Sequence, residues 1–413
     1  MNLANGPRRG DASPVRLLVG LGGLYTAQSV IGGVIFTGLP AVMRQSGASL
    51  NDIALVLITV LPWSFKFLWS PAVERFRSPH VGRRRSRLVV GVVGAFGAGA
   101  IAACAVIGTA ALLPLMVAMV IASFCSATVD IACDGHAVES LAEKDRGWGN
   151  AAQVGGAYLG AAIGGGLFLV LIDHLGWTPS TLVMAAILVG LALPFLLAPD
   201  GARAARPDRP PQSIMAALKR PEMRSGLALI AFYVLGQKWA SVLIGPFLID
   251  AGLSLTLLGV LQGVGVTVVG LAGAAGGGAL VRRYGAFGVM AAALAAQAAA
   301  TAGFALCAYA EIHSPALLSA IAVVSAGTLS LGFVAVYSEL MGRASPDQAG
   351  VDFTLFQSMD AIVAVVGWWL VSALGDAFGF AAGFGVVAAA SLAACLALGL
   401  GFGAGRAREA RAV

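Results

Sequence analysis

Apolar residues recur in runs of about 20 along almost the whole chain, and short polar segments separate the runs. A run of that length crosses the roughly 30 Å hydrocarbon core of a bilayer as an α-helix. The pattern therefore predicts an all-α integral membrane protein. Its twelve predicted spans lie near residues 17–43, 52–73, 88–108, 111–137, 150–173, 180–198, 225–249, 255–281, 286–309, 315–341, 351–374 and 380–404.

Composition supports this prediction. Of the 413 residues, 58% are hydrophobic and 11% are charged, whereas about 25% of an ordinary soluble domain is charged. The low charge excludes a soluble enzyme, a nucleic-acid-binding protein and a disordered chain. The sequence contains no GxxxxGK[ST] loop, and its five cysteines form no CxxC pair. We expect neither an enzyme nor an ATP-driven pump, and no metal or cofactor.

The basic residues predict an orientation. Cytoplasmic loops of membrane proteins carry the excess of Lys and Arg. If both termini are cytoplasmic, 23 of the 26 Lys and Arg residues lie in cytoplasmic segments, and only Arg44 faces outward. We therefore expect a multi-pass membrane protein with both termini in the cytoplasm.

A Pro- and Arg-rich segment at 199–224 divides the spans into two sets of six. The predicted domains are residues 1–198 and 225–413, joined by this cytoplasmic linker. The halves also echo each other, because Pro40 precedes Gly47-Ala48-Ser49-Leu50 and Pro246 precedes Gly252-Leu253-Ser254-Leu255. Two parallel six-helix halves are the architecture of major facilitator transporters.

Five charged residues are placed at bilayer depth within the spans, namely Lys66, Asp130, Asp134, Lys238 and Asp360. Each costs about 2.5–3.5 kcal/mol to insert, so such residues are usually functional. Their depths along the spans predict that Lys66 meets Asp130 and that Lys238 meets Asp360. Two interpretations remain open: ion pairs that only hold helices together, or an acid that binds a transported proton beside a lysine that binds an anionic substrate.

Uncharged polar and aromatic residues at similar depth extend this set of candidate substrate- and proton-binding residues. Buried amides need hydrogen-bond partners, and a ligand or water in a cavity supplies them. Aromatic rings beside amides suit a flat, polar organic ligand. These candidates are Tyr25, Gln28, Trp63, Gln153, Tyr233, Gln237 and Gln357.

A charged motif follows the second span of each half. Glu74-Arg75, followed by Gly82-Arg83-Arg84-Arg85, resembles the acid-Arg-Gly-Arg-Arg signature of major facilitator transporters. In that family the signature forms a cytoplasmic latch between helices. The second copy, Arg282-Arg283-Tyr284-Gly285, contains no acid, so no latch is predicted there.

Two stretches resemble the AmpG-like branch of the major facilitator superfamily. They are Leu61-Pro62-Trp63-Ser64-Phe65-Lys66-Phe67-Leu68-Trp69-Ser70-Pro71 and Ala127-Thr128-Val129-Asp130-Ile131-Ala132-Cys133-Asp134. The branch includes muropeptide permeases, acetyl-coenzyme A transporters and ferric-siderophore permeases of the pyochelin and rhizobactin type. The resemblance implies functional roles for Lys66 and Asp130.

Within this branch, length favours the siderophore permeases, because muropeptide permeases tend to have two additional helices. The resemblance thus implies a monomeric, proton-driven secondary transporter of the bacterial inner membrane that imports a ferric siderophore from the periplasm. Its expected partners are that small molecule, protons and the lipid bilayer. A muropeptide permease is the alternative, and a drug efflux pump is a further, weaker one.

Overall fold

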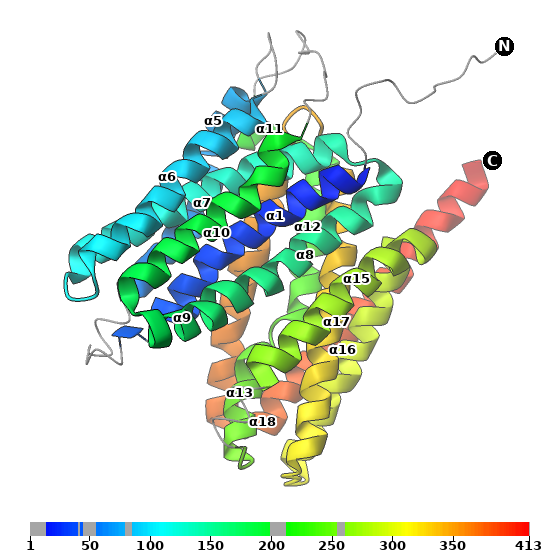
Figure 1. Ribbon diagram of the computed structural model, residues 1–413. Helices are drawn as coiled ribbons and strands as arrows, with labels where there is room; N and C mark the ends of the chain where they lie inside the picture. Colours follow the sequence, from blue (N-terminus) through cyan, green and yellow to red (C-terminus); the bar gives the residue numbers. More distant parts are fainter. Residues whose placement is uncertain are drawn as a thin grey trace, which may run out of the picture. The chain divides into compact units, whose positions relative to one another are not determined.

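The computed structural model describes residues 14–39, 42–43, 55–78, 85–198, 212–253 and 261–412. All regular secondary structure in these ranges is helical (Figure 1). Contacts between residues divide the chain into two compact units. Unit 1 comprises Met1–Asp145, Gly156–Ala217 and Ala344–Thr354, and unit 2 comprises Arg146–Gly155, Leu218–Arg343 and Leu355–Val413.

Four long helices dominate unit 1, where α6 and α7 pack along each other and α10 joins α6 to α1 (Figure 1). Apolar side chains such as Ile101, Met119 and Met184 form their shared core. The helices of this unit are α1 (Pro14–Gly33), α4 (Leu61–Phe65), α5 (Ser70–Arg77), α6 (Ser86–Ile107), α7 (Leu112–Ser140), α9 (Phe168–Leu175) and α10 (Trp177–Leu197). Two others, α8 (Arg146–Ala161) and α11 (Ile214–Lys219), contribute residues to both units.

In unit 2, α17 packs against both α15 and α16. A cluster of aromatic rings fills the core, with centroids 6.1 Å apart for Phe247 and Phe304 and 5.0 Å apart for Phe304 and Phe384. The helices are α12 (Pro221–Gln237), α13 (Ser241–Asp250), α15 (Val266–Tyr284), α16 (Ala286–Tyr309), α17 (Pro315–Arg343) and α18 (Ala349–Ala412). The last of these begins in unit 1.

Two predicted spans are broken at a lysine. The second span runs from α4 through the 3₁₀ turn Lys66–Leu68 into α5. The seventh span ends its first helix at Gln237, and α13 begins at Ser241 after a turn. Short 3₁₀ segments within a helix often mark functional positions, and broken helices at membrane depth occur where backbone lines a site or is buried in protein.

Nine helices of the described chain are long and apolar enough to cross a membrane. The eighth predicted span, 255–281, is described only from Leu261 onward. Part of the difference from twelve is structural, because the break at Lys66 shortens the helices of span 2 and α18 contains both of the last two predicted spans. Gly379, with φ of 83°, separates those two spans at a conformation that favours glycine. The echo at 47–50, the motif residues 82–84 and most of the linker lie outside the described residues.

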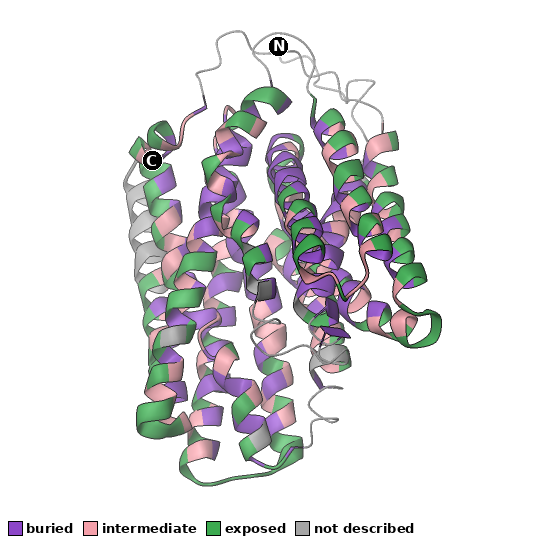
Figure 2. Cartoon of the chain, turned by 90° about the vertical axis from the view of Figure 1, so that its left-hand side faces the viewer, coloured by how far each residue is buried: buried purple, intermediate pink, exposed green. Residues whose placement is uncertain are grey.

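Large apolar side chains also lie on the outside of the helices, including Phe96, Val106 and Leu113. Figure 2 shows exposed and buried positions alternating along the same helices. Contiguous exposed apolar surface is unusual for a soluble protein. On helices of this length it is the surface that contacts lipid, which agrees with a multi-pass membrane protein.

Two glycines of one π-helical segment, Ala162–Leu167, test the close packing in unit 1. A Cβ on Gly164 would overlap the Val30 carbonyl oxygen of α1, whereas a Cβ on Gly166 would meet nothing within 4 Å. We expect Gly164→Ala to lower the free energy of unfolding by about 1–3 kcal/mol. Gly166→Ala should leave it unchanged or raise it by at most about 1 kcal/mol. Thermal unfolding of the two purified variants in detergent compares their stabilities. Equal unfolding midpoints would contradict the close contact between Gly164 and α1.

Candidate functional site

Lys66 and Asp130 form a buried ion pair in unit 1. The Lys66 Nζ contacts the Asp130 Oδ2, and each side chain is only 3% exposed. Asp130 projects from the middle of α7, while Lys66 lies where the second span is interrupted. The ammonium also lies 4.9 Å from the ring centroid of Trp63, a cation–π distance. The structure therefore brings together three of the residues predicted from sequence.

One helical turn further along α7, Asp134 accepts a hydrogen bond from the Tyr25 hydroxyl at 2.8 Å. Residues four apart share one face of a helix, so Asp130 and Asp134 point to the same side of α7. Both carboxylates are buried, and so is Tyr25. Each thus has a positively charged or hydrogen-donating partner, as buried carboxylates require.

Unit 2 contains a second lysine–aspartate pair. The Lys238 Nζ lies 2.6 Å and 2.8 Å from the two carboxylate oxygens of Asp360. The Tyr337 hydroxyl donates to the Asp360 Oδ2 at 2.6 Å, and the ammonium lies 4.4 Å from the Phe333 ring centroid. This pair is more accessible than the first, because the Lys238 side chain is 26% exposed.

The turn that carries Lys238 is held by its own hydrogen bonds. The Lys238 carbonyl oxygen accepts from the Ser241 hydroxyl at 2.6 Å and from the Trp368 indole N–H at 3.1 Å. A backbone carbonyl released by a helix break would otherwise be unsatisfied in the membrane. Trp368 thus stabilises the broken helix.

The remaining predicted residues are less directly connected. Gln28 is buried, and its amide nitrogen has no hydrogen-bond partner among the described residues. In unit 2 the Gln237 amide donates to the Tyr233 hydroxyl at 3.4 Å, and Tyr233 packs edge-on against Phe333. Gln153 on α8 and Gln357 on α18 are half-buried amides.

A further buried network lies at the end of α5. The Arg77 guanidinium lies 2.6 Å from the Glu74 Oε1 and 2.9 Å from the Glu139 Oε2. Glu74 also accepts the backbone N–H of Gly350, at the start of α18, at 3.1 Å. Burial by itself lowers the pKa of Arg77, but the two carboxylates outweigh burial and raise that pKa above its ordinary value.

This network corrects one detail of the sequence motif. The arginine beside Glu74 in space is Arg77, whereas Arg75 is exposed. The i, i+3 spacing of Glu74 and Arg77 on a helix is a signal that the sequence carries. The contacts of Glu74 with Gly350 and of Arg77 with Glu139 depend on tertiary packing.

A family model described as the Major Facilitator Superfamily matches residues 21–367. The chain belongs to this superfamily. It is 31% identical over 351 residues to the anhydromuropeptide permease of Escherichia coli K12. The alignment covers 82% of this chain and 70% of that permease. It is 25% identical over 269 residues to a putative transporter, AmpG 4, of Rickettsia felis, covering 59% of this chain and 63% of that one. These relatives support the AmpG-like branch, whereas they do not support closeness to siderophore permeases.

Solved structures agree with the major facilitator fold. The E. coli fucose:proton symporter FucP aligns with a TM-score of 0.72 at 15% identity, covering 95% of this chain and 99% of FucP. A bacterial homologue of the iron transporter ferroportin aligns with a TM-score of 0.69 at 18% identity, covering 93% and 98%. At these identities the likeness shows the fold alone. The predicted fold class is confirmed, and this major facilitator is a transporter rather than an enzyme.

Removing one partner of the Lys66–Asp130 pair, called the sealed pair below because both side chains are only 3% exposed, tests how much the pair contributes to stability. Lys66→Met should lower the free energy of unfolding by about 3–5 kcal/mol, because it leaves a buried carboxylate uncompensated. Lys66→Met combined with Asp130→Leu should recover most of that loss, since the pair is then replaced by apolar side chains. Thermal unfolding in detergent measures both variants. A double variant no more stable than the single one would show that the pair is not coupled.

The arginine network gives a second stability prediction. Arg77→Gln should lower the free energy of unfolding by about 3–5 kcal/mol, because Glu74 and Glu139 lose a shared buried cation. The matched control, Arg75→Gln, removes an exposed arginine two residues away and should change it by less than about 0.5 kcal/mol. Comparable losses of folded protein in the two variants would contradict the assignment of Arg77.

Proposed function

We propose that this protein is a proton-coupled importer of anhydromuropeptides in the bacterial inner membrane. The observation that carries the proposal is a lysine–aspartate pair at a broken helix in unit 2, reachable from outside the protein and held beside aromatic rings. The relative named as an anhydromuropeptide permease supports the choice of substrate. A muropeptide is an amino sugar with a short peptide, so it offers carboxylates to a lysine and amides to polar side chains.

Lys238 is the group that receives the substrate carboxylate in this proposal. Its side chain is 26% exposed, compared with 3% for Lys66, so an anion reaches it without unpacking the protein. Substrate binding replaces the Asp360 carboxylate at the ammonium. Phe333 keeps the ammonium in place through the cation–π contact while its partner changes.

Displacement of Asp360 couples the substrate to a proton. The freed carboxylate is 9% exposed and keeps only the Tyr337 hydroxyl among the partners that the structure gives it. A buried carboxylate without a cation is unfavourable as an anion and is neutralised by protonation. Substrate and proton therefore bind together, as a symporter requires. In this account the sealed Lys66–Asp130 pair holds the broken second span in place.

Import of a ferric siderophore is the competing assignment, and a drug efflux pump is another. The siderophore assignment depends on chain length alone, and length does not determine what a binding site recognises. Both importers would use Lys238 for an anionic group, so the substrates must be compared directly.

Uptake by cells separates these functions. A strain that lacks its own muropeptide permease should accumulate tritiated anhydromuropeptide only when it expresses this chain. Uptake of radio-iron supplied as ferric pyochelin and the minimum inhibitory concentrations of common drugs should be unchanged by expression. Iron uptake without muropeptide uptake would overturn the proposal in favour of a siderophore importer, and raised drug tolerance alone would favour efflux.

Asp360→Asn tests the coupling step. The amide cannot carry the proton, so we expect accumulation driven by a proton gradient to fall at least about tenfold, whereas exchange of labelled for unlabelled muropeptide continues. Asp376→Asn is the matched control, because it makes the same change at an exposed position of the same helix. Both are measured in proteoliposomes with and without an imposed pH gradient. Accumulation by Asp360→Asn at the control level would remove Asp360 from the mechanism.

A further inference from the structure

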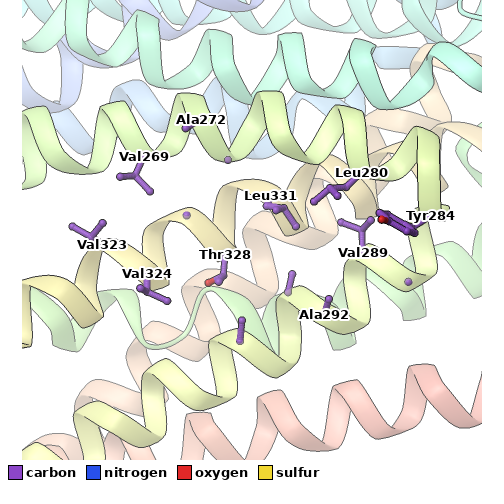
Figure 3. Close-up of a pocket in the computed structure, with 15 residues that line it drawn as sticks. Val269, Ala272, Leu280, Tyr284, Val289, Ala292, Val323, Val324, Thr328 and Leu331 are labelled. Atoms are coloured by element: carbon purple, nitrogen blue, oxygen red, sulfur yellow. The ribbon is translucent and has the colours of Figure 1, made fainter.

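Unit 2 has an open apolar groove on the three helices α15, α16 and α17. It has a volume of about 860 Å³ and is lined by small and aliphatic residues (Figure 3). One of its lining residues, Gly288, faces open space, because an added Cβ there would meet nothing within 4 Å. The volume lies within the roughly 300–1,000 Å³ of small-molecule sites, so the groove is large enough to hold a ligand.

The chemistry of the groove does not suit a polar substrate. Apart from Tyr284, Thr328 is the one lining residue with a polar side chain. Its hydroxyl already donates within the helix bundle, to the Gln297 Oε1 at 2.7 Å. An amide- and hydroxyl-rich ligand would lose its hydrogen bonds with water and gain few in return. The groove therefore fits a hydrocarbon chain.

Two arginines adjoin one end of the groove along the chain, although neither lines it. Tyr284 lines this end, and the exposed Arg282 and Arg283 come directly before it at the end of α15. The Arg283 guanidinium lies 5.2 Å from the Tyr284 ring centroid. Neither arginine forms an ion pair with any residue that the structure describes. Both arginines belong to the second charged motif of the sequence, Arg282-Arg283-Tyr284-Gly285, which contains no acid.

The length of the groove matches one lipid. Along α15, Val269 and Tyr284 lie toward opposite ends of the groove (Figure 3), and the fifteen helical steps between them correspond to about 22 Å. Half of a bilayer, from headgroup to midplane, measures about 20–22 Å. Basic pockets between transmembrane helices bind anionic headgroups, and Tyr is enriched at the interface.

We propose that this groove binds an acidic phospholipid, whose phosphate contacts Arg282 and Arg283 and whose acyl chain lies along the groove between α15, α16 and α17. The occupant follows from charge complementarity at one end and apolar surface along the rest. Because the groove is separate from Lys238 and Asp360, the proposal does not depend on which substrate is transported. The proposal gives the second charged motif, Arg282-Arg283-Tyr284-Gly285, a role in binding lipid.

Native mass spectrometry of the full chain in detergent tests this proposal by titration with dioleoylphosphatidylglycerol or dioleoylphosphatidylcholine. Two basic residues, at about 1 kcal/mol each, correspond to about 30-fold tighter binding of the anionic lipid. Glycerol 1-phosphate, a soluble headgroup without acyl chains, should not compete at equal concentration. Equal affinity for the two lipids, or full competition by glycerol phosphate, would overturn the proposal.

Two variants locate the lipid, each with a matched control. Arg282→Gln with Arg283→Gln should reduce the preference for phosphatidylglycerol to less than about threefold, whereas Lys219→Gln with Arg224→Gln, two exposed basic residues elsewhere in unit 2, should preserve it. Gly288→Leu should weaken binding of phosphatidylglycerol at least about tenfold by filling the groove. Gly385→Leu is the matched control, because it adds the same side chain to α18, outside the groove, and should leave binding unchanged. An added Cβ meets nothing within 4 Å at either glycine. A preference that survives the arginine changes, or binding unaffected by Gly288→Leu, would contradict the location.

Discussion

The structure depends on stabilising charged side chains that lie within its helices, largely out of contact with water. Each buried ion costs several kcal/mol to take out of water, and only a well-placed partner offsets that cost. The protein meets this requirement with Asp130 for Lys66 and Asp360 for Lys238. Tyr25 and Tyr337 then donate hydrogen bonds to acids at the same sites, Asp134 and Asp360. Because each partner is supplied by a different helix, the charges also fix which helices must lie side by side.

Both lysines occupy interruptions of a helix, yet the two pairs differ in access. Lys66 is sealed, while about a quarter of the Lys238 side chain is exposed. A sealed pair resists exchange of partners, whereas an accessible one admits a competing anion. In the proposed function, the same chemistry therefore has a structural role in unit 1 and a binding role in unit 2. The acid-free basic motif of unit 2 directly precedes Tyr284, which lines an apolar groove of that unit.

The sequence was sufficient to predict the helical class and both lysine–aspartate pairs, because hydropathy sets span length and residue counts set depth. It did not reveal the breaks at Lys66 and Lys238, where packing rather than local propensity decides the backbone. The contacts of Tyr337 with Asp360 and of Arg77 with Glu139 join distant segments, so spacing alone could not identify them. The substrate was the least predictable feature, since length favoured a siderophore and the relatives favour a muropeptide.

Proton uptake on substrate binding tests the central claim most directly. Purified protein in weakly buffered detergent solution, with a pH-indicator dye, receives anhydromuropeptide at saturating concentration. If the substrate carboxylate displaces Asp360 from Lys238, each protein should take up about one proton and the solution should become more alkaline. Asp360→Asn should bind substrate with no pH change. Binding by the natural chain without proton uptake, or with proton release, would contradict the account.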